Sequence, residues 1–122
     1  MSEIIGKITI DVIKLLKLKL TQETPIFIGD SNKNHMKNTH PYEYNRFYSD
    51  LPIIISTADY VRLNTQDNSI EYVKSYGKYI KLAVRVAGDG NYYARSLYFI
   101  ESDRVENLVK KGELKPLTGT EM

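Results

Sequence analysis

The second half of the sequence alternates apolar and polar residues with a period of two, which is the pattern of half-buried β-strands. Four such runs follow Asp59, and short segments rich in Gly, Asn and Asp separate them, as turns require. The runs occupy residues 60–64, 69–76, 79–88 and 91–100. Because they follow one another with short turns, we predict that they form an antiparallel four-stranded sheet.

The first half of the sequence has helical spacing over much of its length. Asp30 or Ser31 can cap a polar helix that runs to Asn38, and Pro41 can open the next helix, which runs to Tyr48. Further predicted elements are a strand running into a helix within 4–20, a short strand closed by Gly29, a helix after Asp50 and a helix within 102–112.

This order of elements predicts an α+β domain in which N-terminal helices precede a four-stranded antiparallel sheet and a C-terminal helix. At 122 residues the chain is long enough for one domain and its own core. We assign residues 1–112 to that domain and expect residues 113–122 to form a frayed tail.

Composition excludes several classes of protein. The chain has no cysteine, so it contains neither disulfides nor a zinc site built on thiolates. No apolar run approaches the ~18 residues of a membrane span, and the first residues lack the pattern of a signal peptide. We therefore expect a cytoplasmic protein without a membrane segment. The 17 basic and 15 acidic residues leave a net charge of +2, too small by itself to indicate nucleic-acid binding.

The Asp89-Gly90 turn predicts which side chains share a face of the sheet. A two-residue hairpin at this turn sets Arg85 opposite Ala94. One face then carries Ile80, Leu82, Val84, Val86, Tyr93, Leu97 and Phe99, and the other carries Lys81, Ala83, Arg85, Ala94, Ser96 and Tyr98. The second face suits the floor of an anion-binding cleft, although it also suits an ordinary solvated sheet surface. Arg95 would point into the core unless a bulge near Ala94, or a register one residue away, turned it outward.

The chain has two histidines, His35 and His40, in one polar stretch. Imidazole exchanges protons near neutral pH, so a pair of histidines beside an arginine can cleave RNA by acid–base chemistry. One would accept the proton of a ribose 2′-hydroxyl, and the other would protonate the departing 5′-oxygen. A metal site is a weaker interpretation, because two histidines five residues apart lie about 140° apart on an ideal helix and no third ligand stands out. The two could also be ordinary surface histidines at the end of a helix.

Several segments together resemble a known group of domains. They are "IFIGDSNKNHMKNTHPYEY", "DYVRLN", "SIEYVKSY" and "LAVRVAGDGNYYARSLYFI", within residues 26–111. This pattern is similar to phage-associated nuclease-like domains of the Barnase–EndoU–colicin–RelE-like superfamily. The resemblance implies a metal-independent ribonuclease without a cofactor, often a toxin or effector module. It implies catalytic roles for His35, His40, Glu71, Arg85 and Ser96, together with Arg95.

We expect the site to join the histidine helix to the open face of the sheet. Glu71 would orient a histidine or act as the base, and Lys81, Arg95 and Tyr98 would contact RNA. An active nuclease would harm its host, so we expect a cognate immunity or antitoxin protein. The alternative is a non-catalytic module of a phage or mobile element that keeps the fold and binds nucleic acid or protein.

Overall fold

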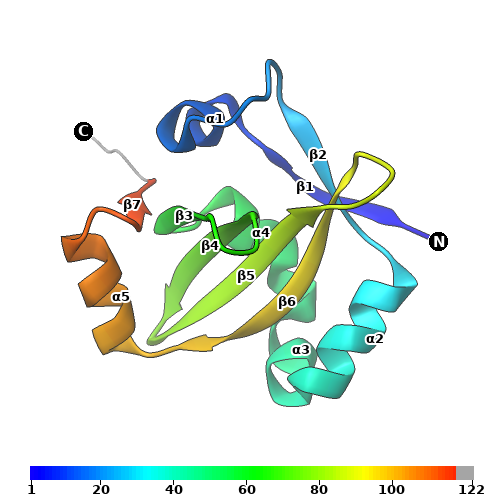
Figure 1. Cartoon of the computed structure of the whole chain (residues 1–122). Helices are drawn as coiled ribbons and strands as arrows, with labels where there is room; N and C mark the ends of the chain where they lie inside the picture. Colours follow the sequence, from blue (N-terminus) through cyan, green and yellow to red (C-terminus); the bar gives the residue numbers. More distant parts are fainter. Residues whose placement is uncertain (118–122) are drawn as a thin grey trace.

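A curled sheet of seven strands runs through residues 1–117, the part of the chain that the computed structural model describes (Figure 1). The strands are β1 (Glu3–Ile8), β2 (Thr24–Ile28), β3 (Tyr60–Asn64), β4 (Ser69–Tyr76), β5 (Lys78–Val86), β6 (Tyr92–Ile100) and β7 (Lys115–Pro116). Their order across the sheet is β1-β2-β6-β5-β4-β3-β7. Neighbouring strands are antiparallel except for β2 and β6, which are parallel, so the sheet is mixed.

The predicted four-stranded antiparallel sheet is therefore wrong, although the fold is α+β. The meander of β3, β4, β5 and β6 forms as the alternation predicts, but three further strands extend it. β2 joins β6 through the pairs Ile26–Tyr92 and Phe27–Tyr93. The partners in these pairs lie far apart in the chain, and no local pattern marks such a pairing. The helices are not mainly N-terminal to the sheet either, because they alternate with strands along the chain.

Five α-helices surround the sheet within the described residues. They are α1 (Ile10–Leu16), α2 (Asp30–Thr39), α3 (Pro41–Phe47), α4 (Leu51–Ser56) and α5 (Ser102–Lys110), with a 3-10 turn at Tyr48–Asp50. Pro41 is the first residue of α3, where its missing N–H costs no helical hydrogen bond. None of these helices is both long and apolar enough to cross a membrane.

The main core lies on one face of the sheet, and α1 and α4 cover that face. Fully buried side chains there include Ile8, Ile26, Ile54, Leu82 and Leu97. The close approach of α4 to β1 requires a glycine, because a Cβ at Gly6 would lie 3.0 Å from the side chain of Ile55. We call the other face the open face, because helices cover it only at its two ends, although Glu71 and Lys81 on its central strands are themselves buried.

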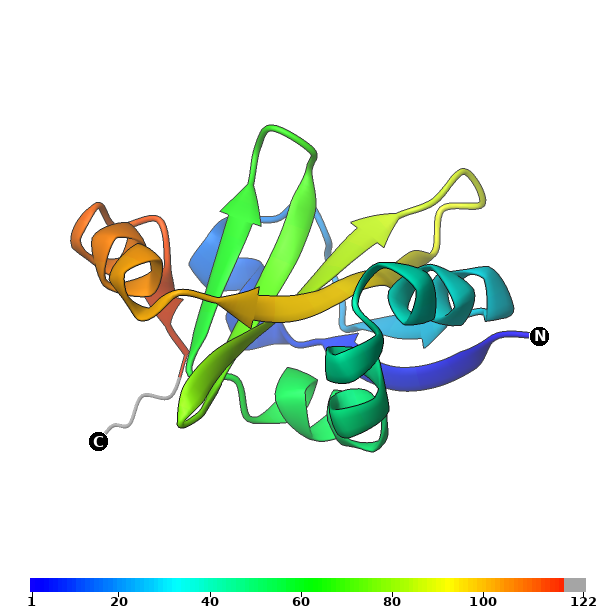
Figure 2. The same cartoon turned by 90° about the horizontal axis from the view of Figure 1, so that it is seen from below.

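A smaller core lies under α5 on the open face. It joins Val73 of β4 to Val105, Leu108 and Leu114. Seen from below, α5 occupies one end of the sheet, and α2 with α3 occupies the other (Figure 2). Leu114 and β7 belong to the segment predicted as a frayed tail, yet Leu114 is 1% exposed and β7 pairs with β3. Residues 118–122 of that predicted tail lie outside the described residues.

Candidate functional site

The open face of the sheet brings together most of the predicted site residues. Lys81 of β5 pairs with Tyr98 of β6, and the next pair along this face is Ala83 with Ser96, as the hairpin predicts. Glu71 of β4 is opposite Ala83 on the other side of β5. Because side chains of paired residues lie on the same face of a sheet, these residues form one surface between α5 and α2.

A β-bulge at Arg95 changes the register of the hairpin. The pairing passes from Ala83–Ser96 to Val84–Ala94, so Arg95 is an extra residue in β6. The prediction that Arg85 is opposite Ala94 is therefore wrong: Arg85 pairs with Tyr93, and Ala94 is fully buried in the core. The bulge that the sequence offered as an alternative is the arrangement found.

The turn of this hairpin explains the difference in register. The loop contains three residues rather than two, because Gly90 N–H donates to the carbonyl of Ala87 at 3.0 Å and Ala87 N–H donates to Asn91. Gly90 has a φ of 85°, a left-handed conformation that glycine adopts without strain. The extra loop residue shifts the first pairs by one position, and the bulge restores the predicted register beyond it.

His35 and Arg95 line one pocket of about 610 Å³ between α2 and the β5–β6 hairpin. Tyr93 and Asp89 also line it, and the Tyr93 hydroxyl donates to the Asp89 carboxylate at 2.7 Å. The backbone N–H of Asn91, and then this hydroxyl, hold the pKa of Asp89 below its usual value. Arg85 is not among the residues that line the pocket, so the bulge brings Arg95 to the His35 side of the face.

His40 lies between α2 and α3, and its imidazole stacks on the ring of Tyr98 in β6. The ring centroids are 5.1 Å apart and the planes are inclined by 21°. The ammonium of Lys81 lies 4.7 Å from the centre of the same tyrosine ring, within the range of a cation–π contact. Nδ1 of His40 is 3.7 Å from the carboxylate of Glu43, which follows it in α3. Tyr98 thus connects a histidine to a cation on the floor of the sheet.

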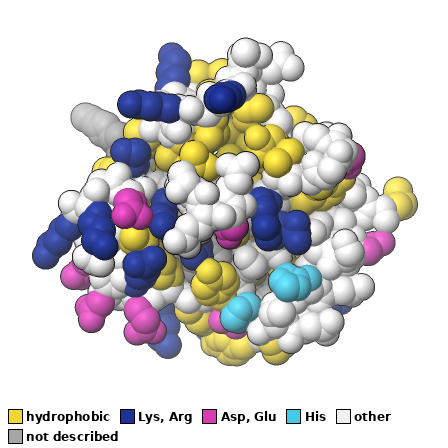
Figure 3. Space-filling view, in the orientation of Figure 1, with side chains coloured by type: hydrophobic (Ala, Val, Ile, Leu, Met, Phe, Trp, Pro, Cys, Tyr) yellow, Lys and Arg dark blue, Asp and Glu magenta, His cyan; other side chains and the backbone are white. Residues whose placement is uncertain are grey.

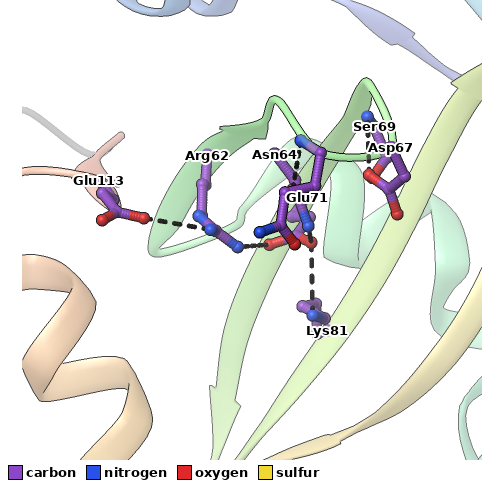
Figure 4. Close-up of polar contacts among 8 residues, drawn as sticks. Arg62, Asn64, Asp67, Ser69, Glu71, Lys81 and Glu113 are labelled. Atoms are coloured by element: carbon purple, nitrogen blue, oxygen red, sulfur yellow. Dashed lines mark hydrogen bonds and ion pairs between the residues drawn. The ribbon is translucent and has the colours of Figure 1, made fainter.

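Glu71 is the centre of a buried polar network (Figure 4). The residue is 2% exposed, and its carboxylate accepts hydrogen bonds from Arg62 at 3.0 Å, Asn64 at 3.2 Å and Lys81 at 3.4 Å. Arg62 also donates to Glu113, at 3.1 Å. Both oxygens of Glu71 are therefore occupied by donors from β3 and β5.

Arg62 and Asn64 were not among the site residues predicted from the sequence. The available signal was the short turn between the predicted strands 60–64 and 69–76, which sets Arg62 opposite Glu71. That turn also contains Asp67, to which the Ser69 hydroxyl donates, and this hydrogen bond holds the pKa of Asp67 below its usual value. The positive charge of Arg85 makes a smaller contribution in the same direction.

The open face gathers positive charge next to the histidines. Figure 3 shows both histidine side chains on this side of the molecule, beside lysine and arginine side chains at the centre of the face. In residues 1–117 no group of three or more His, Asp or Glu side chains is placed to hold a metal ion. The arrangement can bind an anion and can exchange protons with it.

The comparison with known proteins identifies a family for this chain. No curated protein and no solved structure matches the chain. A family model described as "phage-Barnase-EndoU-ColicinE5/D-RelE like nuclease3" matches residues 3–107. The match confirms the resemblance seen in the sequence, and it extends that resemblance to β1 and α1. The chain therefore belongs to this family of phage nuclease-like domains.

Proposed function

We propose that this nuclease domain is a metal-independent endoribonuclease in which His35 and His40 supply the acid and the base. One observation carries the proposal: His35 shares a pocket with Arg95, and His40 stacks on Tyr98 of the same strand. His35 lies in α2, and His40 is the residue that follows the last residue of this helix. Arg95 and Ser96 of β6 come before Tyr98, so a phosphate bound there would have an imidazole on either side.

The chemistry follows from these positions. One imidazole accepts the proton of the ribose 2′-hydroxyl, and the 2′-oxygen attacks phosphorus. The bond from phosphorus to the 5′-oxygen breaks, and the other imidazole gives its proton to that oxygen. The products are a 2′,3′-cyclic phosphate and a free 5′-hydroxyl. The guanidinium of Arg95, with the hydroxyl of Ser96 next to it in β6, stabilises the charge that builds on the phosphate oxygens, and Arg85, which does not line the pocket, has a smaller role.

The remaining predicted residues support the two histidines. Tyr98 holds the ring of His40, and Lys81 holds a positive charge under Tyr98. In this proposal Glu71 holds the ammonium of Lys81 in position, because its two oxygens already accept hydrogen bonds from Arg62, Asn64 and Lys81. This assignment replaces the expectation that Glu71 orients a histidine or acts as the base.

A cleavage assay with matched variants tests the proposal. We expect the purified protein to cleave a single-stranded RNA in EDTA, to leave a 2′,3′-cyclic phosphate, and to spare DNA, which lacks the attacking hydroxyl. His35→Ala and His40→Ala should each lower the rate by roughly 10²- to 10⁴-fold. Asn34→Ala, at an exposed position beside His35, is the control and should cleave normally. Chelator-sensitive cleavage, or full activity in either histidine variant, contradicts the mechanism.

The biological setting follows from the same activity. We propose that the protein acts on cytoplasmic RNA as a toxin or effector, and that a cognate immunity or antitoxin protein protects the producing cell. Expression of the wild-type protein should then arrest growth, and His35→Ala should relieve the arrest. RNA binding without cleavage or toxicity would favour the alternative of a non-catalytic binding module.

A further inference from the structure

A second pocket, lined by aromatic and basic side chains, lies beside the histidine site. It has a volume of about 540 Å³ and is formed by α3, the β4–β5 turn and the end of β6. Its lining residues are Tyr42, Arg46, Phe47, Tyr76, Gly77, Lys78 and Phe99. None of the roles proposed above uses these side chains.

The pocket exposes an aromatic ring. Tyr42 is 60% exposed, so its ring is accessible to a ligand. Its ring centroid lies 6.2 Å from that of Phe99, and the two planes are inclined by 41°. Phe47 supports Phe99 from below with an edge-to-face contact at 5.8 Å. Tyr42 therefore presents a flat ring to solvent on a fixed aromatic base.

The pocket is also positively charged. Arg46 donates to the Tyr42 hydroxyl at 3.1 Å, and the ammonium of Lys78 lies 5.5 Å from the centre of the Phe99 ring. Neither cation forms an ion pair with a carboxylate within residues 1–117, and no Asp or Glu lines the pocket. Rings for stacking and unneutralised cations are the two features of sites for single-stranded nucleic acid.

The pocket adjoins the site along two elements at once. Tyr42 follows His40 by two residues in α3. Phe99 follows Tyr98 in β6 but points to the opposite face of the sheet, so the pocket lies around the edge of β6 from His40. Among the described strands, β2 pairs with β6 only at Tyr92 and Tyr93, so no strand separates this end of β6 from α3. A ligand bound across His40 can therefore continue into the pocket without crossing another strand.

We propose that this pocket binds a base of single-stranded RNA next to the nucleotide that is cleaved. The base stacks on Tyr42, and Arg46 and Lys78 contact the neighbouring phosphates. The choice of RNA rests on the proposed ribonuclease function. Because a base must leave its partner to stack on the ring, the pocket selects unpaired RNA that extends beyond the cleaved bond.

Equilibrium binding of a non-cleavable ligand tests the pocket separately from cleavage. The probe is a fluorescent 2′-O-methyl RNA dodecamer without secondary structure, whose Kd is measured by fluorescence anisotropy at several salt concentrations. We expect Tyr42→Ala to raise the Kd by roughly 5- to 150-fold, and Tyr42→Phe to bind within about 2-fold of the wild type. Lys78→Ala should lower the slope of log Kd against log salt by about 0.7. Lys14→Ala, which removes an equal charge from exposed α1, is the control and should change neither value.

The outcomes separate the pocket from the reaction. Weaker binding by Tyr42→Ala alone, in a protein that cleaves nothing, supports the pocket and contradicts the ribonuclease. Wild-type affinity in Tyr42→Ala, or an equal loss in Lys14→Ala, overturns the pocket even when RNA is cleaved. A wild-type protein that does not bind the dodecamer also overturns it.

Discussion

Replacement of Glu71 by glutamine should destabilise the protein strongly. The side chains of Glu71 and Lys81 are 3% and 10% exposed, so the variant leaves the ammonium of Lys81 buried without a carboxylate. Removal of one partner from a buried ion pair costs about 3–5 kcal/mol. Arg62 keeps its second carboxylate, from Glu113, at 3.1 Å. The expected loss in the free energy of unfolding is therefore ~3 kcal/mol, at the low end of this range.

Thermal and urea unfolding, followed by far-UV circular dichroism, measure this loss. For a chain of this size we expect Glu71→Gln to lower Tm by roughly 10–15 °C. Glu113→Gln is the matched control: its carboxylate contacts the same arginine but is 46% exposed, so its loss should cost less than ~1 kcal/mol.

A double variant tests the stated cause. Lys81→Met removes the unpaired charge, so Glu71→Gln with Lys81→Met should be more stable than Glu71→Gln alone. If Glu71→Gln unfolds within ~1 kcal/mol of the wild type, or no more easily than Glu113→Gln, the buried ammonium of Lys81 does not depend on the Glu71 carboxylate.

Three further predictions concern the bulge at Arg95, the hydroxyl of Tyr76 and the glycine of β1. Arg95→Ala should lower the rate of RNA cleavage by roughly 10²- to 10³-fold and Arg85→Ala by less than ~10-fold. Equal losses in the two variants would contradict the inference that the bulge makes Arg95 the arginine that binds the phosphate. Burial, and then the hydrogen bond to a carboxylate of the 3-10 turn, raises the pKa of Tyr76 to about 12. The folded protein thus keeps this proton while the unfolded chain loses it near pH ~10, so stability is full below that pH and falls toward pH 12. Tyr76→Phe should make urea midpoints less dependent on pH in this window, and an unchanged dependence would contradict the assignment. Gly6→Ala should lower the free energy of unfolding by about 1–3 kcal/mol, because its Cβ would crowd α4, and a neutral effect in urea unfolding would show that α4 moves aside.

Local patterns in the sequence predict local structure well here. The strands from Tyr60 to Ile100 follow from alternation, because one side of each carries apolar side chains that face the core and the other carries mostly polar or amphipathic ones. The bulge could be anticipated for a related reason. A strict alternation would bury Arg95, and the cost of burying a guanidinium favours a change of register.

Long-range pairing could not be predicted in this way. Whether the short strand before Gly29 joins the sheet depends on residues more than sixty positions away, and its own residues fit an isolated strand equally well. The same limit applies to the candidate site. Which arginine lies beside His35 depends on the hairpin loop, where one extra residue moves Arg85 away from the pocket.

The parallel pairing of β2 with β6 also sets the order in which the protein can be completed during synthesis. β1 and β2 leave the ribosome first, but Tyr92 and Tyr93 follow several seconds later at roughly 5–20 residues per second. The nascent hairpin has no sheet to join during this interval. His35 lies in α2 and His40 at its end, whereas Arg95 and Tyr98 lie in β6, so the imidazoles cannot meet these partners before β6 has been synthesised. A ribosome that makes this chain is therefore not exposed to an assembled site until nearly all of the domain has been translated.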